Sequence, residues 1–291
     1  MRFALFGNIY QQSKAAAVRL FMDCLKQHGA DVIVEKEYFD FLFANRLIGQ
    51  EDLAATFDGN NFEADFAVSM GGDGTLLRTA SLVRDKQVPI LGVNMGRLGF
   101  LADVTAEEIN NCVDALYQGD YKTESRVLIK VETDGEPITG YNCALNDVAI
   151  LKRDTASMIA IRTIVGGSYL TTYQADGLIV STPTGSTAYS LSNGGPIIVP
   201  QTGVLSLTAV APHSLNVRPI VIPDSSEIEL TVSSRSHTFL VAIDGRSCSL
   251  PEGTTLRLSR APYQVKVVKR KDAHYFNTLR DKMMWGADGR V

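Results

Sequence analysis

The chain has 291 residues, and at roughly 150 residues per domain this length predicts two domains. Its composition, 45% hydrophobic and 21% charged, is that of a globular protein and excludes disordered, collagen-like and disulfide-framework chains. The formal net charge of −4 provides no overall electrostatic attraction for nucleic acid, so we expect no nucleic-acid partner.

Short apolar runs alternate with helical patterns over the first part of the chain. The apolar runs predict strands at residues 3–6, 32–34, 66–70 and 89–93. Helices are predicted at 18–25 and 76–84 from their apolar spacing, and at 105–117, where Thr105 and Glu108 form a capping-box signature ahead of Gly119. Because strands alternate with helices, we expect βαβ units around a parallel sheet, in a Rossmann-like α/β domain.

From about residue 121 to 270 the chain consists of short runs rich in Val, Ile, Thr and Tyr, which predict an all-β domain. The clearest strands are expected at residues 127–133, 158–165 and 228–232. We expect a terminal helix to bury an apolar stripe against the α/β domain; its members are Phe276, Leu279, Met283 and Met284. The predicted domains are therefore residues 1–121 with 271–291, and residues 122–270.

The cysteines are few and scattered, at positions 24, 112, 143 and 248, with no C-x-x-C spacing. They predict buried thiols in a reducing compartment. The sequence has no apolar stretch long enough to span a membrane, and its N-terminus lacks the features of a signal peptide. We therefore expect a cytoplasmic protein without a membrane partner.

The most informative segment is GGDGT, residues 71–75, between a predicted strand and a predicted helix. Three glycines in such a turn let backbone N–H groups approach an anion, and the helix N-terminus behind them adds its positive dipole end. This turn is therefore predicted to cradle phosphate groups, with Gly71, Gly72, Gly74 and Thr75.

Asp73 stands in the middle of this turn, where it would repel phosphate unless it addresses Mg²⁺ or the proton of an attacking hydroxyl. The alternative is a tight strand–helix turn in which Asp73 caps the helix. The sequence has neither a G-x-x-x-x-G-K-[ST] Walker loop nor a G-x-G-x-x-G after a strand. Their absence argues against a P-loop NTPase and a Rossmann-type dehydrogenase.

Two polar segments lie in the predicted β region. Residues 176–190, DGLIVSTPTGSTAYS, begin as a strand and continue as a loop of hydroxyl, small and aromatic side chains suited to line ribose and a purine ring. Taken alone, such a loop is more commonly an ordinary turn between strands. Asn146-Asp147 lies within the apolar stretch 144–151, where it marks either a bulge or an amide and a carboxylate aimed into a pocket.

Together these three segments resemble the NAD kinase family. Further matches are NMGRLGFL at 94–101, PHSL at 212–215 with Arg218-Pro219 following, and LRDK at 279–282 before Trp285. The resemblance extends from Gly7 to Trp285. GGDGT alone is shared with diacylglycerol and sphingosine kinases, whereas the STPTGSTAY loop with its following glycines is far more specific.

This resemblance implies ATP-dependent phosphorylation of the 2′-hydroxyl of the adenosine ribose of NAD, giving NADP and ADP with Mg²⁺ or another divalent cation. It also implies an N-terminal α/β domain, a C-terminal β-sandwich that binds the dinucleotide, and a terminal helix that returns to the first domain. A homo-oligomer, dimer or tetramer, is implied as well. No protein ligand of the metal is assigned.

In the first domain, the resemblance implies that Asp73 is the base that accepts the ribose proton and that Gly74 contacts the dinucleotide. Arg78 lies one helical turn further on, where a basic side chain can reach phosphate. An exposed, solvated arginine is the alternative for that position.

In the second domain, Asn146 and Asp147 match an Asn-Glu pair that holds adenine and ribose. Asp147 is one methylene shorter than the family's glutamate, so its ribose contact requires a closer backbone or a water. Asp176 matches the acid that receives the nicotinamide carboxamide. The other positions expected to bind NAD are Thr184, Thr187, Ala188, Tyr189, Ser192, Ala211 and Arg246, the last of them from a neighbouring subunit.

Two alternative functions stay open. A lipid kinase of the diacylglycerol or sphingosine type would use the same phosphate cradle, and it predicts an apolar channel for an acyl chain in the β domain. A non-catalytic NAD(P)-binding sensor on the same fold would bind the dinucleotide but release no ADP.

Overall fold

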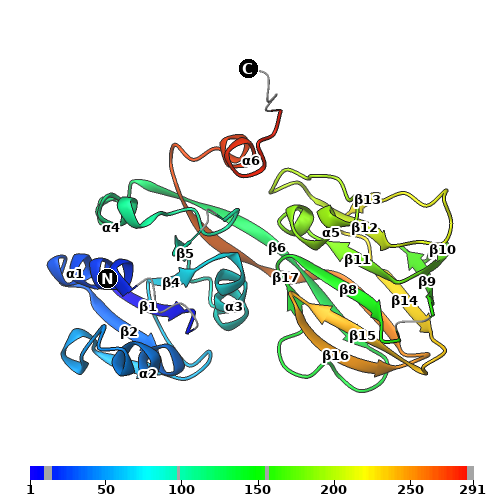
Figure 1. The fold of residues 1–291 in the computed structure, drawn as a ribbon, viewed down its shortest axis with the longest axis horizontal. Coiled ribbons are helices and arrows are strands. Elements are labelled where there is room, and N and C mark those ends of the chain that lie inside the picture. Colours follow the sequence, from blue (N-terminus) through cyan, green and yellow to red (C-terminus); the bar gives the residue numbers. More distant parts are fainter. Residues whose placement is uncertain (10–14, 97–98, 155–156, 287–291) are drawn as a thin grey trace. The chain divides into compact units, whose positions relative to one another are not determined.

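The computed structural model describes residues 1–9, 15–96, 99–154 and 157–286. The chain divides into two compact units, Met1–Ser125 with Val265–Val291, and Arg126–Gln264 (Figure 1). These limits lie within a few residues of the boundaries expected at 121 and 270, while the assignment of a function to each domain stays a prediction. Arg97 and Leu98 of the NMGRLGFL segment lie outside the described residues.

A parallel sheet forms the centre of the first unit, in the order β3-β2-β1-β4-β5. Every neighbouring pair in this order is parallel, as the alternation of strands and helices predicts. The strands are β1 (Arg2–Gly7), β2 (Asp31–Glu35), β3 (Ala55–Phe57), β4 (Phe66–Gly71) and β5 (Ile90–Asn94).

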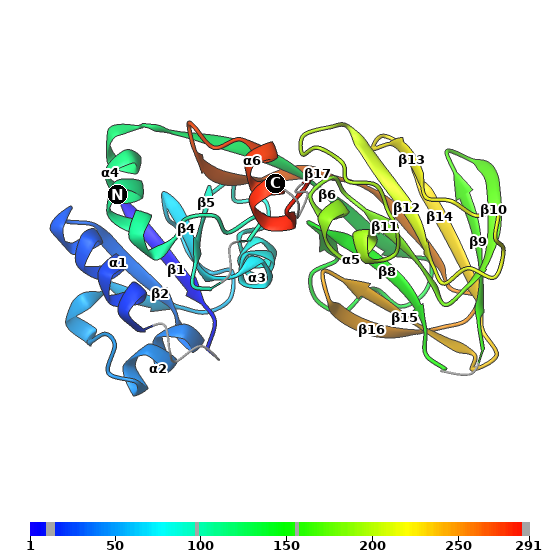
Figure 2. The same cartoon turned by 45° about the horizontal axis from the view of Figure 1, so that its top comes forward.

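Successive strand residues point to opposite faces of the sheet, so a strand with every residue buried must be covered on both faces. Leu5 and Val68 share one buried core with α1 and α4, two helices that lie side by side (Figures 1 and 2). Helix α3 packs against β4 and β5, and every residue of β4 is buried. The helices of this unit are α1 (Ala15–Gln27), α2 (Lys36–Ala44), α3 (Asp73–Val83), α4 (Ile109–Gln118) and α6 (Tyr275–Met283).

Two antiparallel layers form the second unit. One is the sheet β13-β12-β11-β8-β15-β16, and the other contains β10-β9-β14-β17. Val148 and Val241 of the first layer share one buried core with Ile161 and Leu230 of the second, so this unit is a β-sandwich, as predicted. Its strands include β8 (Asp147–Lys152), β9 (Ile159–Val165), β10 (Ser168–Ala175), β11 (Gly177–Ser181), β12 (Val204–Val210), β13 (Ile220–Pro223), β14 (Ile228–Ser233), β15 (Thr238–Ile243) and β16 (Arg246–Pro251).

Two long strands belong to both units. Strand β6 (Tyr121–Thr133) follows α4 and later pairs with the short β7 (Cys143–Ala144). Strand β17 (Thr255–Arg270) pairs with β14 near its start, while Val267 near its end pairs with Ile90 of β5. The chain therefore enters and leaves the sandwich along strands.

Most predicted elements are confirmed, and the capping box is present, with the Thr105 backbone N–H donating to Glu108 Oε2 at 2.9 Å. Helix α2 and strand β3 were not predicted. The prediction that the terminal helix buries an apolar stripe is wrong. Of its four expected members only Leu279 is buried, while Phe276 is 58% and Met284 is 74% exposed. Among the helices of the described residues, none has the length and apolar character that crossing a bilayer requires.

Candidate active site

The GGDGT turn joins β4 to α3 at the carboxyl edge of the parallel sheet. Gly71 is the last residue of β4, and α3 begins at Asp73. A Cβ atom added at Gly72 or Gly74 would meet no atom within 4 Å, so the backbone there is open to a bound group. The first N–H groups of a helix lack intrahelical partners, and the N-terminus of α3 lies at this opening. The turn has the form that phosphate binding requires.

A pocket of about 460 Å³ opens beside this turn. Its lining comes from the ends of β1 and β4 and from the starts of α2 and α3: Gly7, Asn8, Ile9, Glu37, Gly72, Gly74, Thr75 and Arg78. In open α/β sheets, ligands bind outside the carboxyl ends of the strands. We call this space the GGDGT pocket.

Asp73 does not act as the N-cap of α3, since that position belongs to Gly72. Its carboxylate instead accepts three backbone N–H groups from the segment that follows β5. Phe100 donates to Oδ2 at 2.9 Å, and Leu101 and Ala102 each donate to Oδ1 at 3.0 Å. We call residues 99–102 the amide turn. The carboxylate is therefore fixed in direction before any ligand arrives.

The amide turn is held from two further sides. A Cβ atom at Gly99 would lie 1.9 Å from Asp73 Oδ1, so only glycine lets the carboxylate reach the turn. The buried ammonium of Lys269 donates to the Leu101 carbonyl at 3.0 Å and to Asp103 Oδ2 at 2.8 Å. The position of the Asp73 carboxylate therefore depends on a buried network rather than on its own rotamer alone.

Arg78 lines the GGDGT pocket, where its guanidinium is already paired. It donates to both carboxylate oxygens of Glu35, at 2.7 and 2.5 Å, and to Glu37 Oε2 at 3.0 Å. Glu35 is only 5% exposed, and its hydrogen bond raises the pKa of Arg78 above the ordinary value. This pairing fixes the guanidinium at the pocket wall, and a direct phosphate contact stays a prediction.

In the sandwich, the STPTGSTAY loop lies directly on the backbone around Asn146. The Thr182 N–H donates to the Asn146 carbonyl at 2.9 Å, and the Thr182 hydroxyl donates to the Leu145 carbonyl at 2.6 Å. At Gly185, an added Cβ atom would lie 2.1 Å from the Asn146 carbonyl oxygen. The two polar segments that the sequence singles out therefore form one group, and its contact needs glycine at position 185.

The Asn146 side chain offers an acceptor with no protein donor. Its Oδ1 atom is buried and has no hydrogen-bond partner among the described residues. A buried, unpaired polar atom costs free energy unless a ligand or water satisfies it. Asn146 therefore carries the feature expected of a group that accepts a hydrogen bond from a bound ligand such as an aminopurine.

Asp244 is a functional candidate that the sequence analysis missed. Its carboxylate accepts the backbone N–H groups of Leu145 at 2.7 Å, Asn146 at 2.8 Å and Asp147 at 3.2 Å. Asp244 lies at a two-residue hairpin turn between β15 and β16, with a φ of 47°. An Asp-Gly pair predicts such a turn but gives no sign of this second role.

The buried Asp147 and the half-buried Asp244 form an interacting acidic pair. Burial first, and then the charge of Asp244, raises the pKa of Asp147 to about 7. Burial also raises the pKa of Asp244, although its three N–H donors and Arg246 oppose the shift. Because hydrogen bonds to the charged form favour that form, we expect Asp147 to hold the proton and Asp244 to hold the charge.

Replacing Asp147 with asparagine is expected to raise the melting temperature more at high pH than at low pH. The folded protein keeps a proton on Asp147 between the ordinary pKa of 3.8 and about 7, whereas the unfolded chain has lost it. Stability therefore falls as the pH rises through this window, and asparagine removes that loss. We expect the advantage of Asp147→Asn over wild type to grow by about 5–10 °C between about pH 4.5 and about pH 8.

Thermal unfolding at the two pH values measures this change, with the exposed Asp58→Asn as a matched control whose difference from wild type stays constant. An advantage of Asp147→Asn that is the same at both pH values would contradict the proton assignment.

The remaining predicted positions form smaller groups within the sandwich. Asp176 forms an ion pair with Lys152 at 2.7 Å, and its backbone bonds to Val210, next to Ala211. Arg246 donates to the Tyr141 and Cys143 carbonyls at 3.0 and 3.1 Å. Along the STPTGSTAY loop and the short α5 (Tyr189–Ser192), Tyr189 and Ser192 are exposed, Thr187 and Ala188 are half-buried, and Thr184 is buried.

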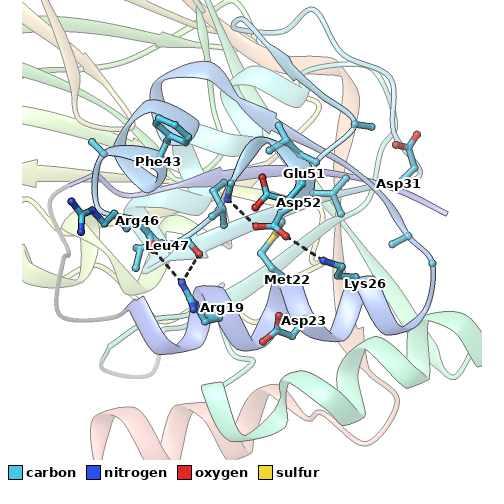
Figure 3. A pocket seen from close by; sticks show the side chains of 18 residues that line it. Arg19, Met22, Asp23, Lys26, Asp31, Phe43, Arg46, Leu47, Glu51 and Asp52 are labelled. Carbon is cyan, nitrogen blue, oxygen red and sulfur yellow. Dashed lines mark hydrogen bonds and ion pairs between the residues drawn. The ribbon is translucent and has the colours of Figure 1, made fainter.

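A second, larger pocket of about 1010 Å³ lies between α1 and residues 43–54, and its lining includes none of the predicted site residues (Figure 3). Two of its basic side chains are engaged: Lys26 pairs with Asp52 at 3.4 Å, and Arg19 donates to the Arg46 carbonyl at 3.0 Å. Asp52 also accepts the Gly49 N–H at 2.8 Å. These contacts support the local fold, so we do not place the active site there.

Known proteins match this chain over almost its whole length. The sequence profile of the ATP-NAD kinase N-terminal domain matches residues 3–121, and that of the C-terminal domain matches residues 145–270. The chain belongs to the NAD kinase family. This confirms the resemblance found in its motifs.

Individual members of the NAD kinase family match closely. The NAD kinase of Bacteroides fragilis is 54% identical over all of both chains, and that of Porphyromonas gingivalis is 42% identical over 98% of each. Among solved structures, an NAD kinase from Archaeoglobus fulgidus in complex with ATP is 26% identical, with a TM-score of 0.76 over 98% of this chain and 99% of its own. Yeast NADH kinase complexed with NADH has a TM-score of 0.88 over 100% of this chain and 89% of its own, and at 22% identity it supports the fold.

Proposed function

We propose that this member of the NAD kinase family transfers the γ-phosphoryl group of ATP to the 2′-hydroxyl of the adenosine ribose of NAD, giving NADP and ADP. The observation that carries the proposal is the Asp73 carboxylate, fixed by three backbone amides within a glycine turn that is open to phosphate. Full-length relatives that are NAD kinases support the same reaction.

The first unit supplies the phosphate site and the base. The open backbone at Gly72 and Gly74 would receive the ATP phosphates at the N-terminus of α3, with Gly71 and Thr75 packed against each other behind it. Asp73 would accept the proton of the ribose 2′-hydroxyl as its oxygen attacks the γ-phosphorus, and the bond to the β–γ bridging oxygen breaks to release ADP. Phosphoryl transfer of this kind depends mainly on positioning and charge, so the fixed carboxylate suits it.

The second unit would hold the dinucleotide. The unpaired Asn146 Oδ1 fits the exocyclic amino group of adenine, and Asp147 lies beside it for the ribose. Asp176, at the junction of β10 and β11, is proposed to receive the carboxamide. The further proposed contacts with NAD are Gly74, Arg78, Thr184, Thr187, Ala188, Tyr189, Ser192, Ala211 and Arg246.

A divalent cation such as Mg²⁺ is proposed to accompany ATP. Among the described residues, no group of three or more His, Cys, Asp or Glu side chains is placed to hold a metal ion. Magnesium commonly keeps several waters and binds through substrate phosphates, so a site of this kind fits it when it arrives on ATP. Bound there, it would neutralise phosphate charge.

We also propose a cytoplasmic homo-oligomer. The four cysteines are free thiols, three of them buried, as a reducing compartment favours. In an oligomer, Arg246 would contribute to a neighbouring site only after leaving its carbonyl partners in its own chain.

A coupled assay for ADP release tests the function. With NAD, ATP and Mg²⁺ present, we expect ADP release that depends on NAD and a product that an NADP-specific dehydrogenase reduces. NAD binding without ADP release would indicate a sensor, and ADP release with diacylglycerol or sphingosine but not NAD would indicate a lipid kinase. Either result would overturn the proposal.

A further inference from the structure

The LRDK segment near the C-terminus places a lysine beside Asp73. Lys282, in the last turn of α6, lies with its Nζ atom 4.0 Å from Asp73 Oδ2. The same ammonium lies over the Phe100 ring, 5.2 Å from its centroid. The Lys282 side chain is 28% exposed. Lys282 thus contacts both the carboxylate and a residue that donates to it.

Further contacts of α6 involve Leu279 and Tyr275. Leu279 is its one buried residue among those described, and the Tyr275 ring lies 6.5 Å from the Phe100 ring. A lysine in the last turn is also favoured by the negative end of the helix dipole. The orientation of α6 therefore brings a stabilised cation to Asp73 while Leu279 is buried and Phe276 stays exposed.

The two oxygens of Asp73 have different surroundings. Oδ1 accepts two amide hydrogen bonds, from Leu101 and Ala102, which fill its lone pairs. Oδ2 accepts one, from Phe100, while Lys282 Nζ at 4.0 Å lies beyond hydrogen-bond distance of it. Oδ2 is therefore the oxygen that remains able to accept a further hydrogen bond.

We propose that Lys282 is a positioning residue for phosphoryl transfer, acting on Asp73 Oδ2 and Phe100 so that Oδ2 faces the incoming hydroxyl. The inference rests on the proposed function. In the step it serves, the ribose proton moves to Asp73 Oδ2, the ribose oxygen bonds to the γ-phosphorus, and the bond to the bridging oxygen breaks with its electron pair leaving on ADP. Lys282 forms no bond to substrate.

Three variants test this role by steady-state kinetics. Lys282→Met is expected to lower kcat by about tenfold or more while KM for NAD and for ATP stays within about twofold, because orientation rather than binding is lost. Lys282→Arg keeps the cation and is expected to restore most of kcat. The control Lys271→Met removes an equally long side chain from an exposed pair with Asp120, and it should leave kcat unchanged.

A double-mutant cycle with Asp73→Asn tests whether Lys282 affects kcat through Asp73 or independently of it. If Lys282 acts through Asp73, then Lys282→Met causes no further loss of more than about twofold in the Asp73→Asn background. An undiminished further loss in that background, an unchanged kcat for Lys282→Met, or failure of Lys282→Arg to restore activity would each overturn the role. A wild-type chain that fails to phosphorylate NAD would instead overturn the proposed function.

Discussion

Asp73→Asn is expected to lower kcat by about 10²–10⁴-fold while dinucleotide affinity changes little. The asparagine oxygen can still accept from Leu101 and Ala102, but its amide nitrogen would face the Phe100 N–H, which now donates to Oδ2 at 2.9 Å. One hydrogen bond of the amide turn is therefore lost, at a cost of about 1 kcal/mol, while the base is removed altogether. Steady-state kinetics and NAD titration measure the two effects separately.

A matched control is Asp134→Asn, which also changes a carboxylate that accepts a backbone N–H, from Thr255 at 2.9 Å, in an exposed turn. The asparagine oxygen of this control can still accept from Thr255, so we expect it to lose little stability and no activity. Turnover of Asp73→Asn close to that of wild type would exclude Asp73 as the base.

Gly185→Ala is expected to lower kcat/KM for NAD by about 10²-fold, with little change in KM for ATP. The new methyl group would lie 2.1, 2.4 and 2.7 Å from the carbonyl oxygen, the carbonyl carbon and the Cα atom of Asn146. All three are backbone atoms, so no side-chain rotation relieves the clash. Either the STPTGSTAY loop or Asn146 must shift, and a displacement of about 1 Å is enough for such a loss.

Gly135→Ala provides the control for Gly185→Ala, since a Cβ atom there would meet nothing within 4 Å and its φ is not positive. We expect wild-type kinetics for this control. If Gly185→Ala binds and phosphorylates NAD as the wild type does, then the Asn146 region does not form the dinucleotide site.

Local signals predicted the phosphate turn because its strand, glycines and helix are adjacent in sequence. The partners of its carboxylate were not predictable in this way, since Phe100 lies 27 residues from Asp73, and Asp244 lies 98 residues from Asn146. Only folding brings such donors and acceptors together, and no spacing rule describes them. The motifs therefore identified the candidate site segments, while the structure identified the long-range hydrogen bonds that fix their positions.

The failure to predict α2 and the wrong prediction for α6 have separate physical causes. Helix α2 reads KEYFDFLFA, in which alternating aromatic residues imitate the period of a strand. In α6, helical spacing correctly grouped the apolar residues on one element, but spacing does not reveal whether that face meets a core. Phe276 and Met284 remain exposed, and contacts from Leu279, Tyr275 and Lys282 hold the helix instead.

The destination of the transferred phosphoryl group tests the central claim most directly. The wild-type chain is incubated with NAD, Mg²⁺ and ATP labelled at the γ-phosphate, and the labelled product is separated and its phosphate position assigned by phosphorus NMR. We predict that the label appears in a phosphomonoester on the 2′-oxygen of the adenosine ribose, in NADP. Label that stays in ATP or enters inorganic phosphate or lipid, with no labelled dinucleotide, would contradict the claim.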